Sequence, residues 1–261
     1  DLSGNLSQSK LEVAPNSVEM VELQLRNRRG LSVDNMKPFK LKSHISYAFE
    51  NQPTLEFPFT YYIKPESKYL LKKTKSKTID GDLSDWNALP YSMGDKNARD
   101  LSATFDVAYD ADFIYVAAEV TDNDIKVMPE SSPWTQDYVG IIMNNNTTTK
   151  SALDVGAGWF RESLYRLVSP EKGTIASNHH GSDGTPDDIT IVAKTSTTGY
   201  TMEAKIPIDF AQAVQGKDWK TIRFNLLIGD LDSGKGQELY LFQPNWRSKE
   251  NRVGSGMFFK K

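Results

Sequence analysis

Two tryptophans lie in short polar segments where an aromatic ring could contact a ligand. Trp134 lies within Ser-Pro-Trp-Thr-Gln-Asp (132–137), and Trp246 lies within Phe-Gln-Pro-Asn-Trp-Arg (242–247). Because neither segment alternates like a strand or repeats like a helix, burial of the rings does not follow from the pattern. Each ring is either a flat apolar platform for a ligand or a plug at the end of a β-sandwich. Position alone leaves both interpretations open.

The composition excludes several classes of site. The 261 residues include no Cys, which excludes disulfides, thiol nucleophiles and Cys-ligated metal centres. No apolar run approaches the roughly 20 residues needed to span a bilayer, so we expect no membrane span. The first residues lack a basic-then-apolar signal segment, which predicts that such a signal was removed or never present.

The charge changes sign along the chain. Residues 1–78 carry 13 basic and 8 acidic side chains, a net charge of +5, whereas residues 79–261 carry 18 and 26, a net charge of −8. A shift of this kind indicates a domain boundary near residue 78. The lysines between 64 and 77 are typical of a solvated connector as well as of a polyanion-binding patch, and we expect no nucleic-acid partner.

The elements that must position the two tryptophans are predicted to be nearly all strands. Before residue 75, apolar side chains alternate over 21–25, 39–49 and 55–61, with turn residues between the runs. This handful of strands predicts a small Ig-like β segment over residues 1–74, with a Lys-rich connector to residue 78. The segment is also compatible with the tail of a larger domain.

Residues 79–261 are predicted to form an antiparallel β-sandwich or jelly roll, which makes the whole chain all-β. Short apolar runs recur at near-regular spacing, with Gly, Asp and Asn turns between them. The run over 113–120 is apolar enough for a central strand covered on both faces. The predicted strands cover 103–109, 113–120, 138–143, 164–168, 189–193, 200–206, 222–228, 238–242 and 257–259, and one short helix is expected over 208–214.

The order of several motifs resembles family 9 carbohydrate-binding modules and their DOMON-like relatives, over residues 79–261. The domain start is Ile-Asp-Gly-Asp-Leu-Ser-Asp-Trp (79–86), in which Trp86 is expected to anchor the segment against the sandwich. Each motif alone is weak, but five in the right order are fairly specific for the fold. The other matching stretches are 105–122, 133–139, 199–207 and 224–230, and the tail from Trp246 to Gly256 also fits.

The resemblance implies a β-sandwich that holds a sugar between two Trp rings, at the positions of Trp134 and Trp246. The axial C–H faces of a sugar ring are apolar, so two stacked rings can desolvate both faces. The resemblance also places Arg166 in this slot, with Gln243 and Asn245 as amide contacts to hydroxyl groups.

One position departs from the family pattern. Six residues after the first Trp the family has a Glu, and this sequence has Gly140. Loss of that acceptor favours a second interpretation, in which the domain is an accessory structural or interaction sandwich that binds no sugar. A third interpretation, a hydrolase, needs two carboxylates facing one slot. Most acidic residues of the second part fall in turns, so we expect no enzyme.

The resemblance further implies structural calcium, which prefers clustered hard oxygen atoms. The candidate ligands lie in two acidic segments, with Asp80 and Asp82 in the first and Asp122 and Asp124 in the second. Asp-Gly and Asn-Asp are also ordinary turn formers, so a turn without a metal remains open for both. Apart from calcium, no cofactor is expected.

Together these observations predict the non-catalytic carbohydrate-binding end of a larger bacterial polysaccharide-degrading protein. We expect it to be secreted, and therefore extracellular or periplasmic. The expected partners are the end of an oligo- or polysaccharide and a catalytic domain in the same polypeptide or complex. Tethering to such a domain would raise the effective substrate concentration.

Overall fold

A computed structural model describes twelve segments of the chain. These are residues 2–6, 23–27, 39–47, 53–63, 69–94, 100–128, 133–147, 163–171, 173–177, 188–232, 236–243 and 256–261. The chain divides into two units, Asp1–Ser67 and Lys68–Lys261. Each unit is described below by itself.

The first unit contains two antiparallel strand pairs in its described part. Strand β1 (Leu2–Leu6) pairs with β2 (Leu23–Asn27), and β3 (Phe39–Tyr47) pairs with β4 (Leu55–Ile63). The alternating runs predicted three of these strands, and β1 was not predicted. Pro58 lies within β4, which pairs only with β3 among the described residues, as expected for an edge strand. The Ig-like assignment of residues 1–74 remains a prediction.

The second unit is built almost entirely from strands, which confirms the predicted all-β class. The helical elements in its described segments are α2 (Asp209–Gln215), close to the predicted 208–214, and the 3-10 turns η2 (Leu83–Asp85) and η3 (Pro133–Thr135). Its strands are β5 (Tyr69–Lys73), β6 (Tyr91–Gly94), β7 (Ser102–Tyr109), β8 (Phe113–Thr121), β9 (Tyr138–Asn144), β10 (Ser163–Ser169), β11 (Gly173–Ser177), β12 (Thr190–Ser196), β13 (Gly199–Pro207), β14 (Thr221–Asp230), β15 (Glu238–Leu241) and β16 (Met257–Lys260).

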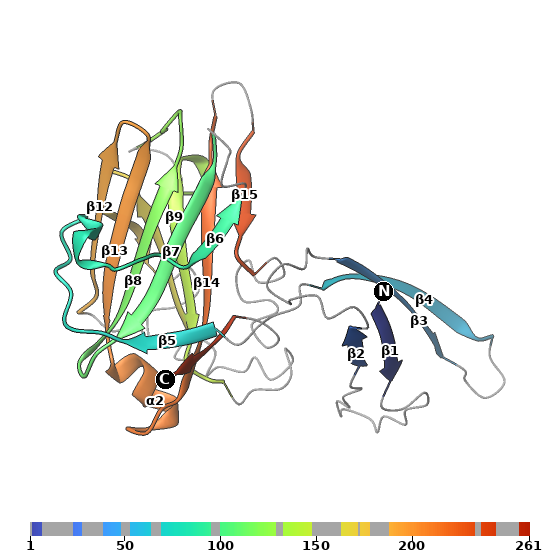
Figure 1. Cartoon of the computed structure of the whole chain (residues 1–261). Helices are drawn as coiled ribbons and strands as arrows, with labels where there is room; N and C mark the ends of the chain where they lie inside the picture. The colour runs from blue at the N-terminus through green and yellow to red at the C-terminus, as the bar shows by residue number, and fades with distance from the viewer. Residues whose placement is uncertain are drawn as a thin grey trace. The chain divides into compact units, whose positions relative to one another are not determined.

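These strands form a continuous sheet folded into two facing layers (Figure 1). The order is β11-β10-β9-β14-β16-β5-β7-β8-β13-β12, with β15 beside β14 and β6 beside β7. Strand β5 joins the layers, because it pairs in parallel with β16 on one side and β7 on the other. Below, the layer with β9, β10 and β14 is the first layer, and the layer with β7, β8 and β13 is the second.

The core follows from the alternation along these strands. In β8, Ile114, Val116 and Ala118 pack into the main core between the layers. Tyr115 and Ala117 point to the opposite side and pack with Trp86. This explains why the run is apolar on both sides from Phe113 to Ala118, as predicted for a central strand. Trp86 anchors the start of the second unit, also as predicted.

Strand β5 is the main difference from the predicted domain organisation. The sequence assigned residues 69–73 to the end of the first segment, but Leu71 is fully buried in the main core of the second unit. Its neighbours Leu70, Lys72 and Lys73 are exposed, which produces the basic character of a connector. The structural division therefore falls between Ser67 and Lys68.

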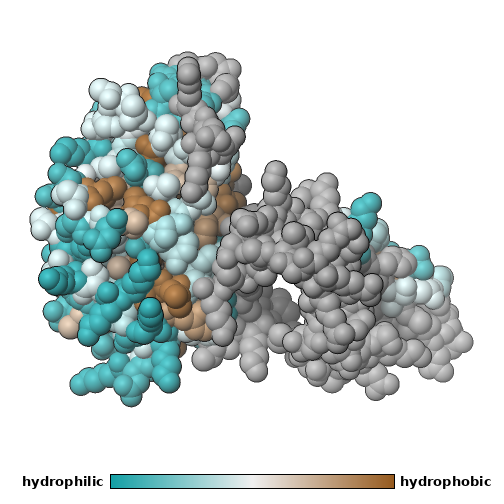
Figure 2. Space-filling view, in the orientation of Figure 1, coloured by the Kyte–Doolittle hydropathy of each residue, from teal (hydrophilic) through white to brown (hydrophobic). Residues whose placement is uncertain are grey.

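The visible surface of the second unit is mainly hydrophilic, with small hydrophobic areas between (Figure 2). Among the described residues, its exposed large apolar side chains, Leu70, Met128 and Val214, lie in separate parts of the sequence. Scattered apolar residues of this kind are normal on a protein surface. Within the described segments, no helix has the length and apolar character required to cross a membrane.

Candidate functional site

Trp134 lies on the 3-10 turn η3, directly before β9, and its ring is half-buried. The residues that follow it, Gln136 and Asp137, are buried at 3% and 0% exposure. The ring is thus carried by a turn whose C-terminal end is fixed in the protein. Trp246 and Asn245, the partners predicted for it, lie outside the described residues, so the two-ring clamp remains a prediction.

Gly140 is enclosed by apolar side chains on the side of the first layer that faces away from the main core. It pairs with Leu167 on β10 and Leu227 on β14. A Cβ atom at this position would lie 3.2 Å from Leu227 Cβ and 3.3 Å from Leu167 Cδ2. These contacts are tighter than ordinary packing. Leu167 and Leu227 therefore occupy the space that a side chain at position 140, such as the family's Glu, would need.

Arg166 faces the other side of the same layer. It pairs with Ile141, which belongs to the main core, and is next in sequence to Leu167, which faces Gly140. Because alternate residues of a strand face opposite sides, positions 140 and 166 do not point into one slot. The Arg166 side chain is 8% exposed, its Nη1 donates to the Tyr165 carbonyl at 3.2 Å, and burial lowers its pKa.

Gln243 has hydrogen-bond partners inside the protein. Its side chain is 1% exposed, and its Nε2 donates to the Tyr69 hydroxyl at 3.3 Å. Its backbone N–H donates to Asn225 Oδ1 at 2.7 Å, and its carbonyl accepts from Asn225 Nδ2 at 3.2 Å. Gln243 therefore ties the end of β15 to β14 and β5.

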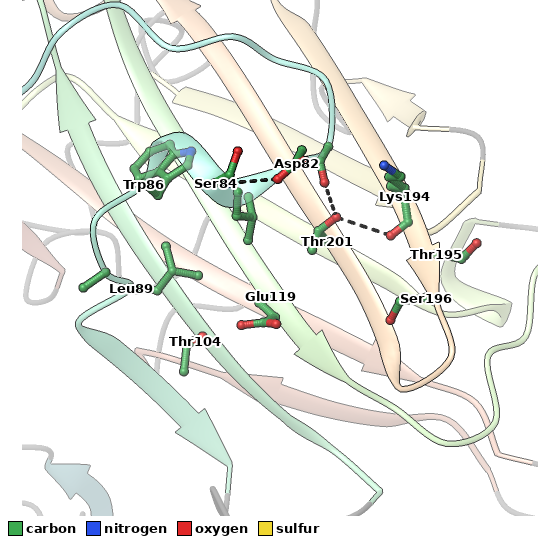
Figure 3. Close-up of a pocket in the computed structure, with 13 residues that line it drawn as sticks. Asp82, Ser84, Trp86, Leu89, Thr104, Glu119, Lys194, Thr195, Ser196 and Thr201 are labelled. Atoms are coloured by element: carbon green, nitrogen blue, oxygen red, sulfur yellow. Dashed lines mark hydrogen bonds between the residues drawn. The ribbon is translucent and has the colours of Figure 1, made fainter.

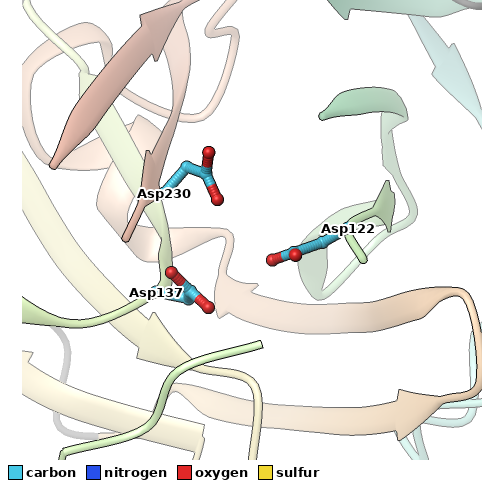
Figure 4. A group of neighbouring side chains, drawn as sticks. All are labelled: Asp122, Asp137 and Asp230. Atoms are coloured by element: carbon cyan, nitrogen blue, oxygen red, sulfur yellow. The ribbon is translucent and has the colours of Figure 1, made fainter. Parts of the chain in front are cut away.

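Three buried aspartates from distant parts of the sequence converge, and we call them the aspartate triad (Figure 4). Asp122 follows β8, Asp137 precedes β9 and Asp230 ends β14. One carboxylate oxygen of each lies within 4.8 Å of the others. The three side chains are 3%, 0% and 5% exposed. The pairing of Tyr138 with Gly229 explains the closeness of two of them, because it brings positions 137 and 230 opposite each other.

Burial and neighbouring carboxylates raise the pKa of all three carboxyl groups. Burial is the larger cause for each, followed for Asp230 by the charges of Asp122, Asp232 and Asp137. The pKa rises to about 6 for Asp137, where hydrogen bonds from Lys126 and Leu231 oppose the shift, and to about 7 for Asp230. A cation between the three would favour their ionised forms.

The donor set fits a hard divalent cation. Calcium takes oxygen ligands at about 2.3–2.6 Å, so two ligands of one ion lie at most about 5 Å apart. Among the described residues, Asp122 Oδ2 and the Tyr200 hydroxyl have no hydrogen-bond partner. The Tyr200 side chain is 2% exposed, and burial and the charges of the triad raise its pKa well above its usual value. Unmatched buried oxygen atoms at a cluster of carboxylates are expected where an ion binds.

Asp124, the second ligand predicted beside Asp122, does not join the triad. Its Oδ1 lies 2.5 Å from Lys126 Nζ, and its backbone N–H donates to Asp122 Oδ1 at 2.8 Å. Of the two ligands predicted in this segment, Asp122 belongs to the triad and Asp124 does not, and calcium binding stays a prediction. Asp137 and Asp230 were not among the predicted ligands, although both lie inside the motif stretches 133–139 and 224–230.

Asp80 and Asp82 form an exposed turn organised by hydrogen bonds. Asp80 Oδ1 accepts from the Asp82 N–H, and Asp82 Oδ1 accepts from the Ser84 N–H, both at 2.9 Å. The bond from Ser84 lowers the pKa of Asp82 and caps η2. The outcome matches the turn interpretation, since these oxygen atoms satisfy backbone donors.

Glu203 holds this turn against the second layer. It is fully buried, with Oε1 accepting from Trp86 Nε1 at 2.8 Å and Oε2 from the Gly81 N–H at 2.8 Å. The turn forms one wall of an open groove of about 540 Å³ (Figure 3). The floor is a row of residues paired across four strands, Thr104, Glu119, Thr201 and Lys194.

Comparison with known proteins identifies the family. The model of the carbohydrate family 9 binding domain-like family matches residues 79–249. The chain belongs to this family. A search of curated proteins found no match.

Two solved structures have the same fold. One is a family 9 carbohydrate-binding module from Caldicellulosiruptor kristjanssonii in complex with cellotriose, with a TM-score of 0.56 and 19% identity over 74% of this chain and 94% of that one. The other is such a module from the same organism in complex with glucose, with a TM-score of 0.55 and 19% identity over 74% and 96% of the two chains. At this identity the likeness shows the β-sandwich fold.

Proposed function

We propose that the second unit is a non-catalytic module that binds a sugar ring between Trp134 and Trp246. The observation that supports this most is membership of the carbohydrate-binding family over residues 79–249. Trp134 also lies half-buried on a turn with a fixed C-terminal end, as a ligand platform requires. In this proposal Asn245 contacts a hydroxyl, whereas Gln243 and Arg166 support the site from within the protein.

The proposed setting is a larger secreted bacterial protein that degrades polysaccharides. A module of this kind acts through a catalytic domain in the same polypeptide or complex, by raising the local concentration of substrate. One clamped ring supplies a small contact area, so we expect dissociation constants between about 1 μM and 1 mM.

A calorimetric titration with mono- and oligosaccharides tests this proposal. Glucose and cellotriose come first in the panel, because the similar modules hold these ligands. The variants are Trp134→Ala and Trp246→Ala, with Trp219→Phe as a control at a core ring. We expect saturable binding that both Ala variants lose, without a change in cooperative unfolding. Full binding by either Ala variant would contradict the clamp.

The alternative is an accessory sandwich that binds no sugar. Gly140 favours it, because glycine cannot supply the family's carboxylate. Leu167 and Leu227 also pack against this position and leave little space for a side chain. A folded protein with no response to any sugar in the panel would support this alternative.

We also propose that the aspartate triad binds calcium. The support is the convergence of three buried carboxylates with the unpartnered Asp122 Oδ2 and Tyr200 hydroxyl. Asp122→Asn should weaken calcium binding at least tenfold in a calorimetric titration. Asp112→Asn, at the other end of β8, is exposed and should leave binding unchanged. Equal affinities of the two variants would rule out the triad.

A further inference from the structure

We infer that a divalent cation in the aspartate triad fixes the segment that carries Trp134, so that sugar affinity depends on the cation. The inference rests on the proposed function for the sugar, but its structural part concerns only the position of Trp134. It assigns to the triad a control over the binding platform in addition to a contribution to stability.

Asp137 is the physical link between the triad and the platform. Its Oδ1 accepts from the Leu231 N–H at 2.7 Å, beside Asp230. Its Oδ2 accepts from the Lys126 N–H, and its own N–H donates to the Lys126 carbonyl at 2.8 Å. One residue therefore joins the segment after β8, the exit of β14 and the segment of Trp134.

Gln136 extends this link toward the ring. Its carbonyl accepts from Gln237 Nε2 at 3.0 Å, and its Oε1 accepts from the Met128 N–H at 3.4 Å. Trp134 is thus two residues from a buried residue whose carbonyl and side chain have partners on two other segments, and three residues from a member of the triad. A displacement of residues 136–137 has to move η3, because so short a connection cannot absorb it.

The charges make this position dependent on a cation. Three carboxylates within 4.8 Å repel one another strongly in a buried site. The nearby Lys126 ammonium is paired with Asp124, and no salt bridge to a member of the triad occurs in the described segments. Without a divalent cation the repulsion favours separation of the three segments. A bound cation reverses this, because each carboxylate becomes its ligand.

The size of the effect follows from linkage. Coupling between two sites commonly changes affinity between about 5-fold and 150-fold. The platform here is joined to the triad through three residues, and we expect the sugar dissociation constant to fall about tenfold when calcium saturates the protein. By reciprocity, saturating sugar must raise the calcium affinity by the same factor.

Trp134 emission reports the structural part of the inference. The full chain is stripped of metal with a chelator and then titrated with calcium chloride, for the native protein and for Trp134→Phe. The chain has five tryptophans, so the difference between the two spectra isolates Trp134. The same two states are titrated with the sugar panel. Asp122→Asn and Asp230→Asn remove one ligand each, and Asp112→Asn is the matched control.

We expect calcium to change the Trp134 difference spectrum and to raise sugar affinity about tenfold, and the two ligand variants to lose both responses. Calcium that does not bind, or that raises the unfolding temperature while leaving Trp134 emission unchanged, overturns the inference. Equal sugar affinity with and without calcium also overturns it. A changed Trp134 spectrum without binding of any sugar supports the structural link and overturns the proposed function.

Discussion

Two acidic segments that look alike in the sequence have different structures. Asp80 and Asp82 stay in an exposed turn, where their oxygen atoms accept bonds from backbone N–H groups of the same turn. Asp122 is 3% exposed and meets Asp137 and Asp230, which come from other strands. The difference teaches that strand pairing at long range, and not the spacing of acidic residues, decides which carboxylates converge.

The largest expected effect concerns the residue that organises the exposed turn. Glu203→Ala leaves the Trp86 Nε1–H and the Gly81 N–H without their acceptor in a buried region. We expect a loss of about 3 kcal/mol in the free energy of unfolding, measured by chemical denaturation. Glu119→Ala, an exposed position on the same side of the neighbouring strand, should change it by less than about 0.5 kcal/mol. Similar losses in both variants would deny Glu203 this role.

Calcium should stabilise the protein through the triad and not through the turn. At a free calcium concentration 100-fold above the dissociation constant we expect about 2.7 kcal/mol of added stability. For a unit of this size that raises the unfolding temperature by about 5–10 °C, measured by calorimetry with chelator as the reference. Asp82→Asn should keep this response. If Asp82→Asn loses the calcium response, calcium binds at the turn and not at the triad.

Asp106 tests the effect of burial on a carboxyl pKa without the effect of neighbouring carboxylates. Burial raises its pKa to about 6, opposed by the Val107 N–H and two lysines, with no carboxylate among the causes. Since the folded pKa is raised, this group contributes stability that is complete below about pH 4 and is lost as the pH rises through 6. Asp106→Asn removes this dependence.

The gain in stability of Asp106→Asn over the native protein should therefore grow by about 2 kcal/mol between pH 4 and pH 7, since one pKa unit corresponds to about 1.4 kcal/mol. Denaturation at several pH values in saturating calcium measures it. A difference that stays constant over this range would mean that Asp106 titrates normally.

The sign of the Asp230→Asn effect should depend on calcium. In chelator at pH 8 the substitution removes one of three repelling charges, and we expect a gain of about 1–2 kcal/mol in stability. In saturating calcium it removes a ligand, so the variant should be less stable than the native protein. Denaturation under both conditions measures the reversal. The same sign in both would show that no ion binds to Asp230.

The smallest effect belongs to the cap of η2. Asp82→Ala removes the acceptor of the Ser84 N–H and should lower the unfolding free energy slightly, since the group is fully exposed. The calcium response should remain that of the native protein. An unchanged stability would show that the cap contributes nothing in this exposed turn.

Strand patterns predicted the fold well, because alternation reports which side of a strand is buried. The run over 113–120 identified β8 as central, and the order of motifs identified the family. The patterns missed β5, where Tyr69 and Leu71 are buried and Leu70, Lys72 and Lys73 are exposed. Two buried positions in a short segment rich in lysine are too few to reveal the period of a strand.

The candidate site was less predictable, because its parts meet only through sheet pairing. Asp122 was identified from its local cluster, whereas Asp137 and Asp230 become neighbours only because β9 pairs with β14. The resemblance identified Arg166 and the departure at Gly140, but only the register shows that these two positions face opposite sides of a layer. Trp246 and Asn245 lie outside the described residues and remain predictions.

The most direct test of the account is the sugar affinity of the full chain, measured by calorimetry with calcium and with chelator. The account predicts saturable binding of a sugar that needs Trp134, with a dissociation constant about tenfold lower in calcium. Binding that is absent in both conditions, or that Trp134→Ala retains, would contradict it.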